Sequence, residues 1–474
     1  MKWYISQLQA MVSVCSYSTK LFLVRCVFCT IGVIVAIVSC LTLTEHICFR
    51  GSICPPVKTI TVCSTSNKAS ARQISHHQQD MDELRSFYPL FDIGVYVYAS
   101  YWDDRMNDPV IRITGLRLDS TSLNSSRCLI QTADDNVTVV ADVSNIYSDW
   151  PYVFKYYAFM MVCSIPTQLV KWHPNQVTIL LSGGAILSVP ITYAKALFSK
   201  QKELAVCVKP IHGQFDVIRM IEWVEIQKAS GITEFILYDA DLHGASRYVV
   251  DYYRIKGLVQ IVRFPFLLAI LRTADRDGVL GPQLRYSLYQ QTYLLALQDC
   301  IYRFRLSYDF LIVIDLDEVI LPTGDESVVE MFRRQRRNNP KFASYVFPTA
   351  WYFREFRNNT EVASSLLYMQ TYAGAPPPNW YQPKSIVSTR YAVLVNYHEA
   401  KTSLVVPPRH EVPWERFGYV HHFRDGTCRE KFRTEKDDVC ARMKRTIRPD
   451  PSIRRYKIVT LKRVYKLMKY LQLS

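Results

Sequence analysis

Three carboxylates that directly follow an apolar segment are the residues with the clearest chemical potential in this sequence. Phe310–Ile314 is the most apolar strand that the pattern predicts, and Asp315-Leu-Asp317-Glu318 follows it without a break. An extended backbone points residues i and i+2 to the same side, so Asp315 and Asp317 can face one cation. Proteins hold Mg²⁺ or Mn²⁺ with one or two carboxylates together with substrate phosphates. We therefore expect Asp315 and Asp317 to bind Mn²⁺ or Mg²⁺ against a phosphate-bearing substrate.

Two other interpretations of these carboxylates stay open at this point. They could form an acidic loop that caps a helix beginning near Glu326. Four apolar residues followed by Asp-x-Asp-x-Val also resemble the first motif of haloacid-dehalogenase-like phosphatases, in which Asp315 would be the nucleophile. That fold normally begins with this strand, whereas more than a hundred residues with their own strands and helices precede Asp315 here. The later acidic pair Asp437-Asp438 lies in a charged segment that does not read as a strand.

The segments before Asp315 alternate between short apolar strands and amphipathic helices. Such β-α-β alternation predicts an α/β fold with a parallel, twisted sheet covered by helices. In open sheets of this kind ligands bind beyond the carboxyl ends of the strands, which is where Asp315 lies. The predicted strands are Leu204–Val208, Glu234–Tyr238, Val259–Val262 and Phe310–Ile314, and the predicted helices are Phe215–Ser230, Ser246–Ile255 and Leu284–Phe304.

The region of residues 86–200 has a different pattern, with short alternating or β-branched runs separated by turn residues. Strands at this spacing favour a β-sandwich-like accessory module, and no catalytic constellation lies within it. The clearest runs are Gly94–Tyr98, Val110–Ile113, Asn136–Val140 and Gln176–Leu181.

An uncharged run of 19 residues, Cys26–Thr44, lies near the N-terminus. As a helix it would span roughly 28 Å, close to the thickness of a bilayer's hydrocarbon core. Basic residues precede the run and Glu45 follows it, which favours a cytoplasmic N-terminus. We expect a single-pass type II membrane protein with a cytoplasmic tail (1–25), a transmembrane anchor (26–44), a stem (45–85) and the remainder in the lumen.

A luminal body agrees with the acceptor tripeptides and the cysteines. Asn124, Asn136 and Asn358 each begin an Asn-x-Ser/Thr site for N-glycosylation. Nine of the 13 cysteines follow the predicted anchor, on the side where disulfides persist. Their spacing gives no zinc motif.

The formal charge of +15 is concentrated at the C-terminus, where residues 429–474 hold 15 Lys or Arg against 5 Asp or Glu. Residues 451–474 read as a basic amphipathic helix. This helix could lie on a membrane surface or pack on the preceding domain with its cationic face in water. A luminal location excludes a nucleic-acid partner.

The block from Leu204 to about Asp425 resembles glycosyltransferase family 92, once catalogued as a domain of unknown function (family 23). His422-Phe-Arg424 is similar to the family's His-Tyr-Arg, with Phe423 in place of the tyrosine, so any hydrogen bond of that hydroxyl is missing here. The other matching segments are Trp223–Glu225, Phe235–Asp239, Ile314–Glu318, Gln382–Ile386 and His398.

The resemblance implies a GT-A-like (Rossmann-like) mixed sheet with helices on both faces, formed by a catalytic domain at 201–450. It also implies an inverting, metal-dependent transfer of a hexose, galactose in known members, from a UDP-sugar to a glycan acceptor on a glycoprotein or glycolipid. A Golgi or ER membrane location follows from the same resemblance. A catalytically inactive luminal glycan-binding protein is the alternative outside enzymes.

The resemblance also suggests roles for individual residues. Asp317 would bind the metal directly, Asp315 would contact metal-bound water or the ribose, and His398 would complete the metal shell. An inverting transfer needs a carboxylate base, for which Glu318, Glu411 and Glu415 are candidates that the sequence does not separate. Candidates for donor binding are Lys209, Asp239, Lys384, His422 and Arg424; a helix cap is an equal alternative for Asp239, a surface ion pair for Lys384 and a core histidine for His422.

Overall fold

The computed structural model describes residues 88–90, 94–132, 136–146, 155–167, 170, 173–182, 184–265, 282–357, 367–372, 374–433 and 438–472. The expected cytoplasmic tail (1–25), transmembrane anchor (26–44) and stem (45–85) lie outside these residues. Within the described part of the chain, no helix has both the length and the apolar character needed to cross a membrane.

The first described region is a β-rich module whose sheet closes on itself. Its strands run in the order β1-β2-β3-β6-β5-β4-β7-β8, and β8 pairs in parallel with β2 at Ser100↔Ile191. The alternate residues that point inward form one core, and Cys128–Cys163 joins β4 to β6 within it. The strands expected to form a β-sandwich-like module are thus continuous around a single core. Their bounds are β1 Tyr88–Leu90, β2 Val95–Asp103, β3 Val110–Leu118, β4 Arg127–Gln131, β5 Asn136–Asn145, β6 Tyr156–Ser164, β7 Gln176–Leu180 and β8 Ile186–Thr192.

A nine-stranded mixed sheet begins at Lys202. Its order is β11-β10-β9-β12-β16-β14-β20-β13, with β19 also paired to β14. The first four strands are parallel, and β16 runs antiparallel to both β12 and β14. On the other side, β14 pairs in parallel with β19 and β20, and β13 runs antiparallel to β20, so the sheet has a parallel half and a mixed half that meet at β12. The bounds are β9 Lys202–Gly213, β10 Phe235–Leu242, β11 Val259–Arg263, β12 Tyr308–Ile314, β13 Glu318–Pro322, β14 Ser344–Phe353, β16 Asn379–Ser388, β19 Arg409–Glu411 and β20 Gly418–Arg424.

Helices cover both faces of this sheet, as expected. On β9 the side chains of Val206 and Val208 join the core beneath α3 (Val217–Ala229) and α4 (Ala245–Ile255), whereas Ala205 and Cys207 join the core beneath α6 (Pro282–Phe304). This alternation is the consequence of the two-residue period of a strand that is buried on both sides. The disulfide Cys207–Cys300 ties β9 to α6.

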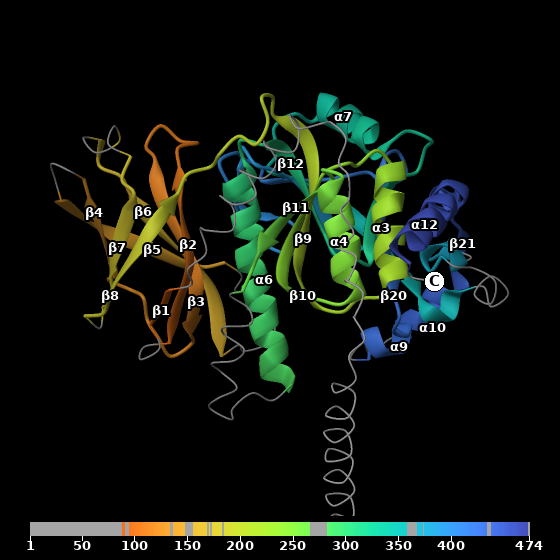
Figure 1. The fold of residues 1–474 in the computed structure, drawn as a ribbon, viewed down its shortest axis with the longest axis horizontal. Helices are drawn as coiled ribbons and strands as arrows, with labels where there is room; N and C mark the ends of the chain where they lie inside the picture. The colour runs from red at the N-terminus through yellow and green to blue at the C-terminus, as the bar shows by residue number, and fades with distance from the viewer. Residues whose placement is uncertain are drawn as a thin grey trace, which may run out of the picture. The chain divides into compact units, whose positions relative to one another are not determined.

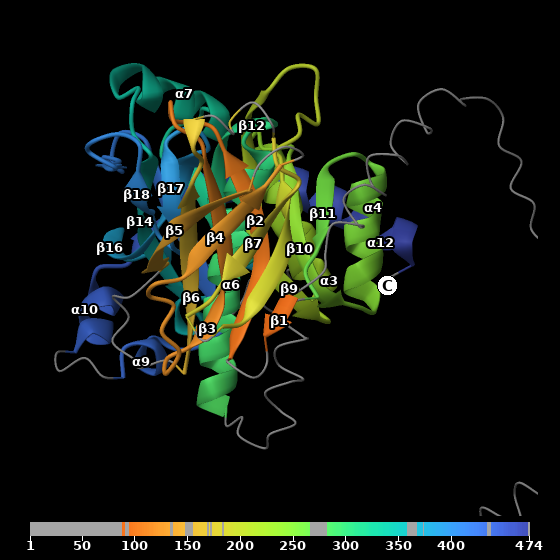
Figure 2. The same ribbon diagram turned by 90° about the vertical axis from the view of Figure 1, so that its left-hand side faces the viewer.

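The helix α6 lies between the β-rich module and the nine-stranded sheet (Figure 1), and Figure 2 shows the module in front of both. Asp299 of α6 is buried and accepts hydrogen bonds at 2.7 Å from Tyr101 of β2 and from Tyr238 of β10. Arg303, one turn further along α6, pairs with the same carboxylate at 2.7 Å. One buried carboxylate therefore joins the module to the nine-stranded sheet.

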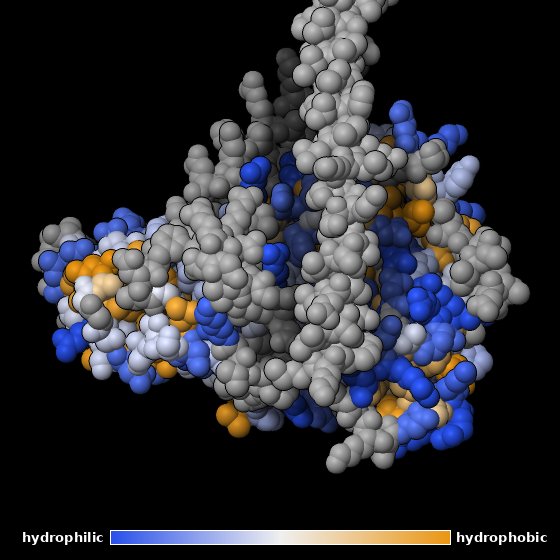
Figure 3. Space-filling view, turned by 90° about the horizontal axis from the view of Figure 1, so that it is seen from below, coloured by the Kyte–Doolittle hydropathy of each residue, from blue (hydrophilic) through white to orange (hydrophobic). Residues whose placement is uncertain are grey.

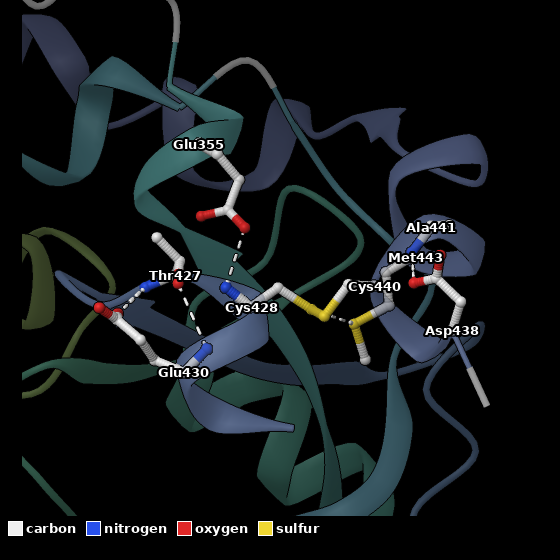
Figure 4. The surroundings of a disulfide bond; sticks show 8 residues. All are labelled: Glu355, Thr427, Cys428, Glu430, Asp438, Cys440, Ala441 and Met443. Carbon is white, nitrogen blue, oxygen red and sulfur yellow. Dashed lines mark hydrogen bonds between the residues drawn. A yellow bond between two sulfur atoms is a disulfide. The ribbon is translucent and has the colours of Figure 1, made fainter. Parts of the chain in front are cut away.

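The C-terminal segment returns to the sheet in short helices, α9 (Cys428–Lys431), α10 (Val439–Arg445), α11 (Pro451–Arg454) and α12 (Lys457–Leu471). Cys428–Cys440 links α9 to α10, and Thr427 caps α9 in a reciprocal pair with Glu430 (Figure 4). The helix α12 packs on α3 with its lysines on the opposite, exposed side. On the face drawn in Figure 3 the described surface is mostly hydrophilic, with hydrophobic residues in small separate groups.

Candidate active site

The strand ends of the two halves of the sheet meet at one place. The register pairs Ile314 of β12 with Val208 of β9, so the next residues, Asp315 beyond the end of β12 and Lys209 within β9, lie side by side. On the other side of β12, Val313 pairs with Ser385, which brings Lys384 of β16 to the same edge. Glu318, the first residue of β13, pairs with His422 of β20. Residues more than a hundred positions apart therefore form one cluster.

Asp315 is held by two lysines. Its Oδ2 atom lies 3.3 Å from Lys209 Nζ and 3.4 Å from Lys384 Nζ, and Tyr293 of α6 donates a hydrogen bond to Oδ1. Burial by itself would raise the pKa of Asp315, but the two ammonium groups outweigh it and hold the pKa well below its ordinary value. The same attraction raises the pKa of both lysines against the effect of burial. All three groups are therefore charged at neutral pH.

Glu318 is completely buried and tightly engaged. Its Oε2 atom pairs with Lys384 Nζ at 2.9 Å and accepts a hydrogen bond from the backbone N–H of Asp315 at 3.0 Å. Its backbone carbonyl accepts a hydrogen bond at 2.7 Å from the indole of Trp223 on α3. A buried carboxylate that is ion-paired in this way organises the site and has little access to an acceptor hydroxyl.

Asp317, Glu318 and His422 form a group suited to a divalent cation. Each offers one ligand atom, and these three atoms lie within 4.8 Å of one another. The Nδ1 atom of His422 lies 3.1 Å from Glu318 Oε1 and its Nε2 atom 3.4 Å from Asp317 Oδ2. Neither ring nitrogen makes a hydrogen bond among the described residues, and the same is true of Glu318 Oε1. The indole of Trp351 stacks on the His422 ring at 4.5 Å between centroids and fixes its plane. Buried polar atoms without partners are costly, and coordination of a metal would satisfy all three.

The metal-capable group opens to solvent on one side. The Asp317 side chain is 43% exposed, whereas the side chains of Glu318 and His422 are buried. Burial would raise the pKa of Asp317, but the adjacent His422 outweighs it and lowers the pKa. A cation held here would keep its free coordination positions toward a substrate at Asp317.

His398, expected in the metal shell, does not lie among these side chains. Its Nδ1 atom is 2.7 Å from the backbone carbonyl of Pro383. Burial and the nearby charge of Lys384 lower the pKa of His398 to about 4, so its ring is neutral and Nδ1 donates to that carbonyl. The structure thus brings His422, which sequence reasoning assigned to the donor, into the place expected for His398.

The remaining donor-binding candidates lie at the rim. Asp239 accepts hydrogen bonds from the backbone N–H groups of Asp241 and Leu242 and pairs with Arg247 of α4, so its carboxylate fixes the turn between β10 and α4. Arg424 ends β20 two residues after His422 and is half-buried. Burial and, after it, the charge of Arg424 lower the pKa of Lys431 to about 8.

Two of the three base candidates are not brought to the site. Glu411 is exposed on β19 and pairs with Arg409 at 2.6 Å. Glu415 lies in the turn before β20, and its backbone carbonyl accepts a hydrogen bond from Thr323, which follows β13. Glu318 begins β13, so Glu415 lies at the other end of that strand. The helix-capping alternative for the acidic run also fails, because α7 (Val328–Asn338) is capped by Ser327.

The expected glycosylation sites fall on the β-rich module and beyond. Asn124 lies exposed in the turn before β4, and Asn136 is exposed at the start of β5. Asn358 lies outside the described residues. The two described asparagines are thus on the surface, as attachment of a glycan requires.

Three aromatic residues of the site were missed by sequence reasoning. Tyr293 contacts Asp315, Trp351 supports His422, and Trp223 holds the backbone of Glu318. Trp223 was noted as a match to a family motif without a role. The spacing of Tyr289 and Tyr293 on one face of the predicted helix was the available signal for Tyr293.

Solved structures and curated proteins add little to this description. TarS from S. aureus (residues 1–349) is 11% identical, with a TM-score of 0.25, and the match covers 48% of this chain and 62% of TarS. Glucosyl-3-phosphoglycerate synthase from Mycobacterium tuberculosis is 12% identical, with a TM-score of 0.23, over 56% of this chain and 80% of that one. Likenesses this weak bear on neither fold nor function. No curated protein matches the chain.

The comparison with protein families is decisive. The family model for glycosyltransferase family 92 matches residues 202–467, more than half of the chain. The match contains the whole nine-stranded sheet and every residue of the cluster around Asp315 and His422. The chain belongs to glycosyltransferase family 92, as its motifs indicated, and is a glycosyltransferase.

Proposed function

We propose that this enzyme transfers a hexose, with galactose as the first candidate, from a UDP-sugar to a glycan acceptor, with inversion at the anomeric carbon. The proposal rests on the family assignment and on the residues at the meeting point of the two half-sheets. It takes precedence over the haloacid-dehalogenase-like alternative, because Asp315 is enclosed by Lys209, Lys384 and Tyr293 and is poorly placed as a nucleophile.

The observation that carries the metal requirement is the set of partnerless atoms on Glu318 and His422. We assign Asp317, Glu318 and His422 as the residues that would hold Mn²⁺ or Mg²⁺. Two carboxylates and an imidazole suit Mn²⁺, while the carboxylates alone would suit Mg²⁺. Bound there, the cation would stabilise the charge that develops on the departing diphosphate. Asp315 then serves to hold the two lysines, in place of the direct metal contact first expected of the pair.

Lys209 and Lys384 would act on the same leaving group. Their charges are fixed beside Asp315, so they need no reorganisation when the bond between the sugar and the diphosphate breaks. Lys209 is partly exposed and can reach a phosphate, whereas Lys384 is buried and holds Asp315 and Glu318 in place. In the transfer the acceptor oxygen forms the new bond to the anomeric carbon, and its proton passes to a base.

The disulfides support a location in the secretory pathway. Every cysteine within the described residues is paired, in Cys128–Cys163, Cys207–Cys300 and Cys428–Cys440. Disulfides persist in oxidising compartments, which include the lumen of the ER and the compartments that follow it. With the apolar run Cys26–Thr44, this supports a type II protein of the Golgi or ER membrane with a luminal catalytic domain.

A donor screen with the full-length chain in detergent tests the proposal. UDP release is measured with each common UDP-sugar and with GDP-fucose, in the presence of Mn²⁺, Mg²⁺ or EDTA. We expect UDP-galactose with Mn²⁺ to give the fastest release, and the anomer of the product, assigned by NMR, to be inverted. Asp317→Asn should abolish release, while Asp325→Asn, an exposed carboxylate beyond the far end of β13, should not.

Three results would contradict the proposal. Unchanged release by Asp317→Asn would remove the metal assignment. Hydrolysis of a phosphomonoester in place of a nucleotide sugar would favour the phosphatase. Glycan binding without any turnover would favour an inactive binding protein.

A further inference from the structure

A bulge in β16 projects from the sheet beside the metal-capable group. The register of β14 and β16 pairs Phe347 with Lys384 and Thr349 with Asn379. Four residues of β16, Trp380–Pro383, therefore stand opposite the single residue Pro348. Such an insertion pushes the chain out of the ladder and re-aims its side chains, and bulges of this kind recur beside active sites.

The bulge is fixed at three points. Thr349 Oγ1 donates to the backbone carbonyl of Gln382 at 2.8 Å, and Lys431 Nζ donates to the Gln382 side chain at 2.9 Å. The Nδ1 atom of His398 donates to the carbonyl of Pro383 at 2.7 Å. Gln382 has a φ of 53°, a left-handed conformation that costs a residue other than glycine about 1 kcal/mol. These anchors hold the bulge in one conformation.

Lys431 is itself held in place from the other side. It ends the short helix α9, which is capped by Thr427 and tied to α10 by Cys428–Cys440 (Figure 4). Its ammonium group lies 5.3 Å from the centre of the Trp351 ring and 5.5 Å from that of Tyr381. The Gln382 side chain and Lys431, the polar groups at the edge of the bulge, are therefore held in place as its backbone is.

The bulge presents two aromatic rings to solvent at the site. Trp380 is 45% exposed and Tyr381 is 43% exposed. The Tyr381 ring packs on Phe432 at 5.2 Å and on Trp351 at 6.0 Å, and Trp351 stacks on His422. The Tyr381 ring thus lies one aromatic layer away from the metal-capable group, and Trp380 is its neighbour in the same bulge. When a ligand covers a large aromatic surface that was exposed to water, the free energy of the system falls.

We propose that Trp380 and Tyr381 form the binding platform for the acceptor sugar, with the C–H face of a pyranose ring on the two aromatic rings and its hydroxyl groups toward Gln382 and Lys431. The bulge has an aromatic surface beside polar groups, and a pyranose likewise has an apolar face of C–H groups bounded by hydroxyls. The inference rests on the proposed glycosyl transfer and adds the place where the acceptor binds.

The topology decides between acceptor and donor. Nucleotides in open α/β sheets bind beyond the carboxyl ends of the parallel strands, here β9 and β10. The bulge lies in β16, on the other side of β12, and so of Asp315 at its end, from those strands. A donor that has its nucleoside on the parallel side and its diphosphate at the carboxylates leaves the bulge for the second substrate.

The test separates the two substrates in steady-state kinetics of the full-length chain. The acceptor probe is whichever wild type uses fastest among methyl galactoside, glucoside, mannoside and fucoside and released N-glycans with core fucose. We expect Trp380→Ala to raise the KM for this acceptor about tenfold and Trp380→Phe to recover most of the loss, with the KM for the UDP-sugar unchanged in both. Tyr465→Ala, which removes an aromatic ring that is 66% exposed on α12, is the matched control and should change neither KM.

Two results would overturn the inference while leaving the glycosyl transfer intact. One is a wild-type acceptor KM in both Trp380→Ala and Tyr381→Ala. The other is weaker binding of UDP alone to Trp380→Ala, measured by calorimetry, which would make the platform a nucleotide site. Failure of the proposed function itself would appear elsewhere, as a wild-type chain that releases no UDP from any of the UDP-sugars.

Discussion

Two neighbouring histidines on β20 face opposite sides of the sheet and meet opposite surroundings. The Nε2 atom of His421 lies 2.6 Å from Ser452 Oγ and 2.8 Å from Asp450 Oδ2, and Asp450 also accepts hydrogen bonds from Tyr352 and Tyr419. His422 has carboxylates nearby but no hydrogen-bond partner for either nitrogen among the described residues.

The hydrogen bonds of the two side chains distinguish a structural histidine from one that can bind a metal. Both side chains are buried, both stack on an aromatic ring and both face an aspartate. Their hydrogen bonds distinguish them, since a buried group that holds the fold together is normally satisfied by the protein itself. The Nε2 atom of His421 is bonded to the protein and only its Nδ1 atom lacks a partner among the described residues, whereas both ring nitrogens of His422 lack one. His421 holds the C-terminal segment to the sheet through Asp450 and Ser452. The ring nitrogens of His422 remain available for the proposed cation, which the chain itself does not supply.

Removal of the unpartnered histidine should have the largest effect on activity. We expect His422→Ala to lower kcat/KM at least about 100-fold and to raise the Mn²⁺ concentration needed for half-maximal rate. The melting temperature should change little, because the ring makes no hydrogen bond that the fold would lose. Manganese titrations of UDP release, with thermal unfolding in parallel, check both statements. Full activity at the usual manganese concentration would contradict the assignment of His422.

Removal of the partnered histidine should act on stability instead. His421→Ala leaves Asp450 buried without its imidazole partner, and we expect a loss of about 3–5 kcal/mol in the free energy of unfolding. The manganese titration of the protein that remains folded should match wild type. Denaturant unfolding measures the loss. A stable variant with an altered manganese response would reverse the roles of the two histidines.

A buried acid on α3, Glu222, adds a prediction about pH. Burial of Glu222 on α3 outweighs the hydrogen bonds it accepts from the backbone N–H groups of Tyr368 and Met369 and raises its pKa to about 7, from an ordinary value of 4.5. Because the folded pKa is the higher one, the free energy of unfolding should fall as pH rises from 4.5 to 7, by up to about 3 kcal/mol.

Asp450 provides the contrast for that prediction. Burial would raise its pKa, but His421 and the surrounding hydroxyls hold it below the ordinary 3.8, so its contribution is complete above that pH and is lost only in stronger acid. Unfolding measured from pH 4.5 to 8 should therefore slope downward in wild type and flatten in Glu222→Gln. An identical slope in the variant would remove Glu222 as the cause.

The smallest effect is expected for a third histidine, His398. Because its ring holds the carbonyl of Pro383, His398→Ala should loosen the bulge and raise the acceptor KM about fivefold, the value of one ordinary hydrogen bond. The manganese titration should not change. A shifted manganese response would instead restore the metal shell first expected from the sequence, Asp315, Asp317 and His398.

The parallel half of the sheet could be predicted from the sequence because its signals are local. The predicted helices Phe215–Ser230 and Ser246–Ile255 correspond to α3 (Val217–Ala229) and α4 (Ala245–Ile255), and the strand Phe310–Ile314 lies within β12. Each was read from periodicity inside one short window, and the β-α-β order then fixed where Asp315 would emerge.

The mixed half could not be predicted in the same way. Glu318 begins a strand, β13, that pairs with β20 a hundred residues later, and no local pattern reveals that register. His398 follows β17 (Ala392–Val395), which pairs with β18 (Ala400–Ser403) in a small separate sheet, and its ring is hydrogen-bonded to the carbonyl of Pro383. Long-range pairing decided which histidine faces Asp317.

The bridging carboxylate Asp299 has a consequence for how this enzyme can be divided. A cut near residue 201 would follow the change in sequence pattern, yet it would strip the β-rich strands from α6 and leave Asp299 without Tyr101. The tyrosines and aliphatic side chains that now line this shared core would face water. The β-rich strands can therefore be exchanged, in evolution or in protein engineering, only together with the face of α6 that they cover. We expect the β-rich module and the glycosyltransferase domain to be inherited together.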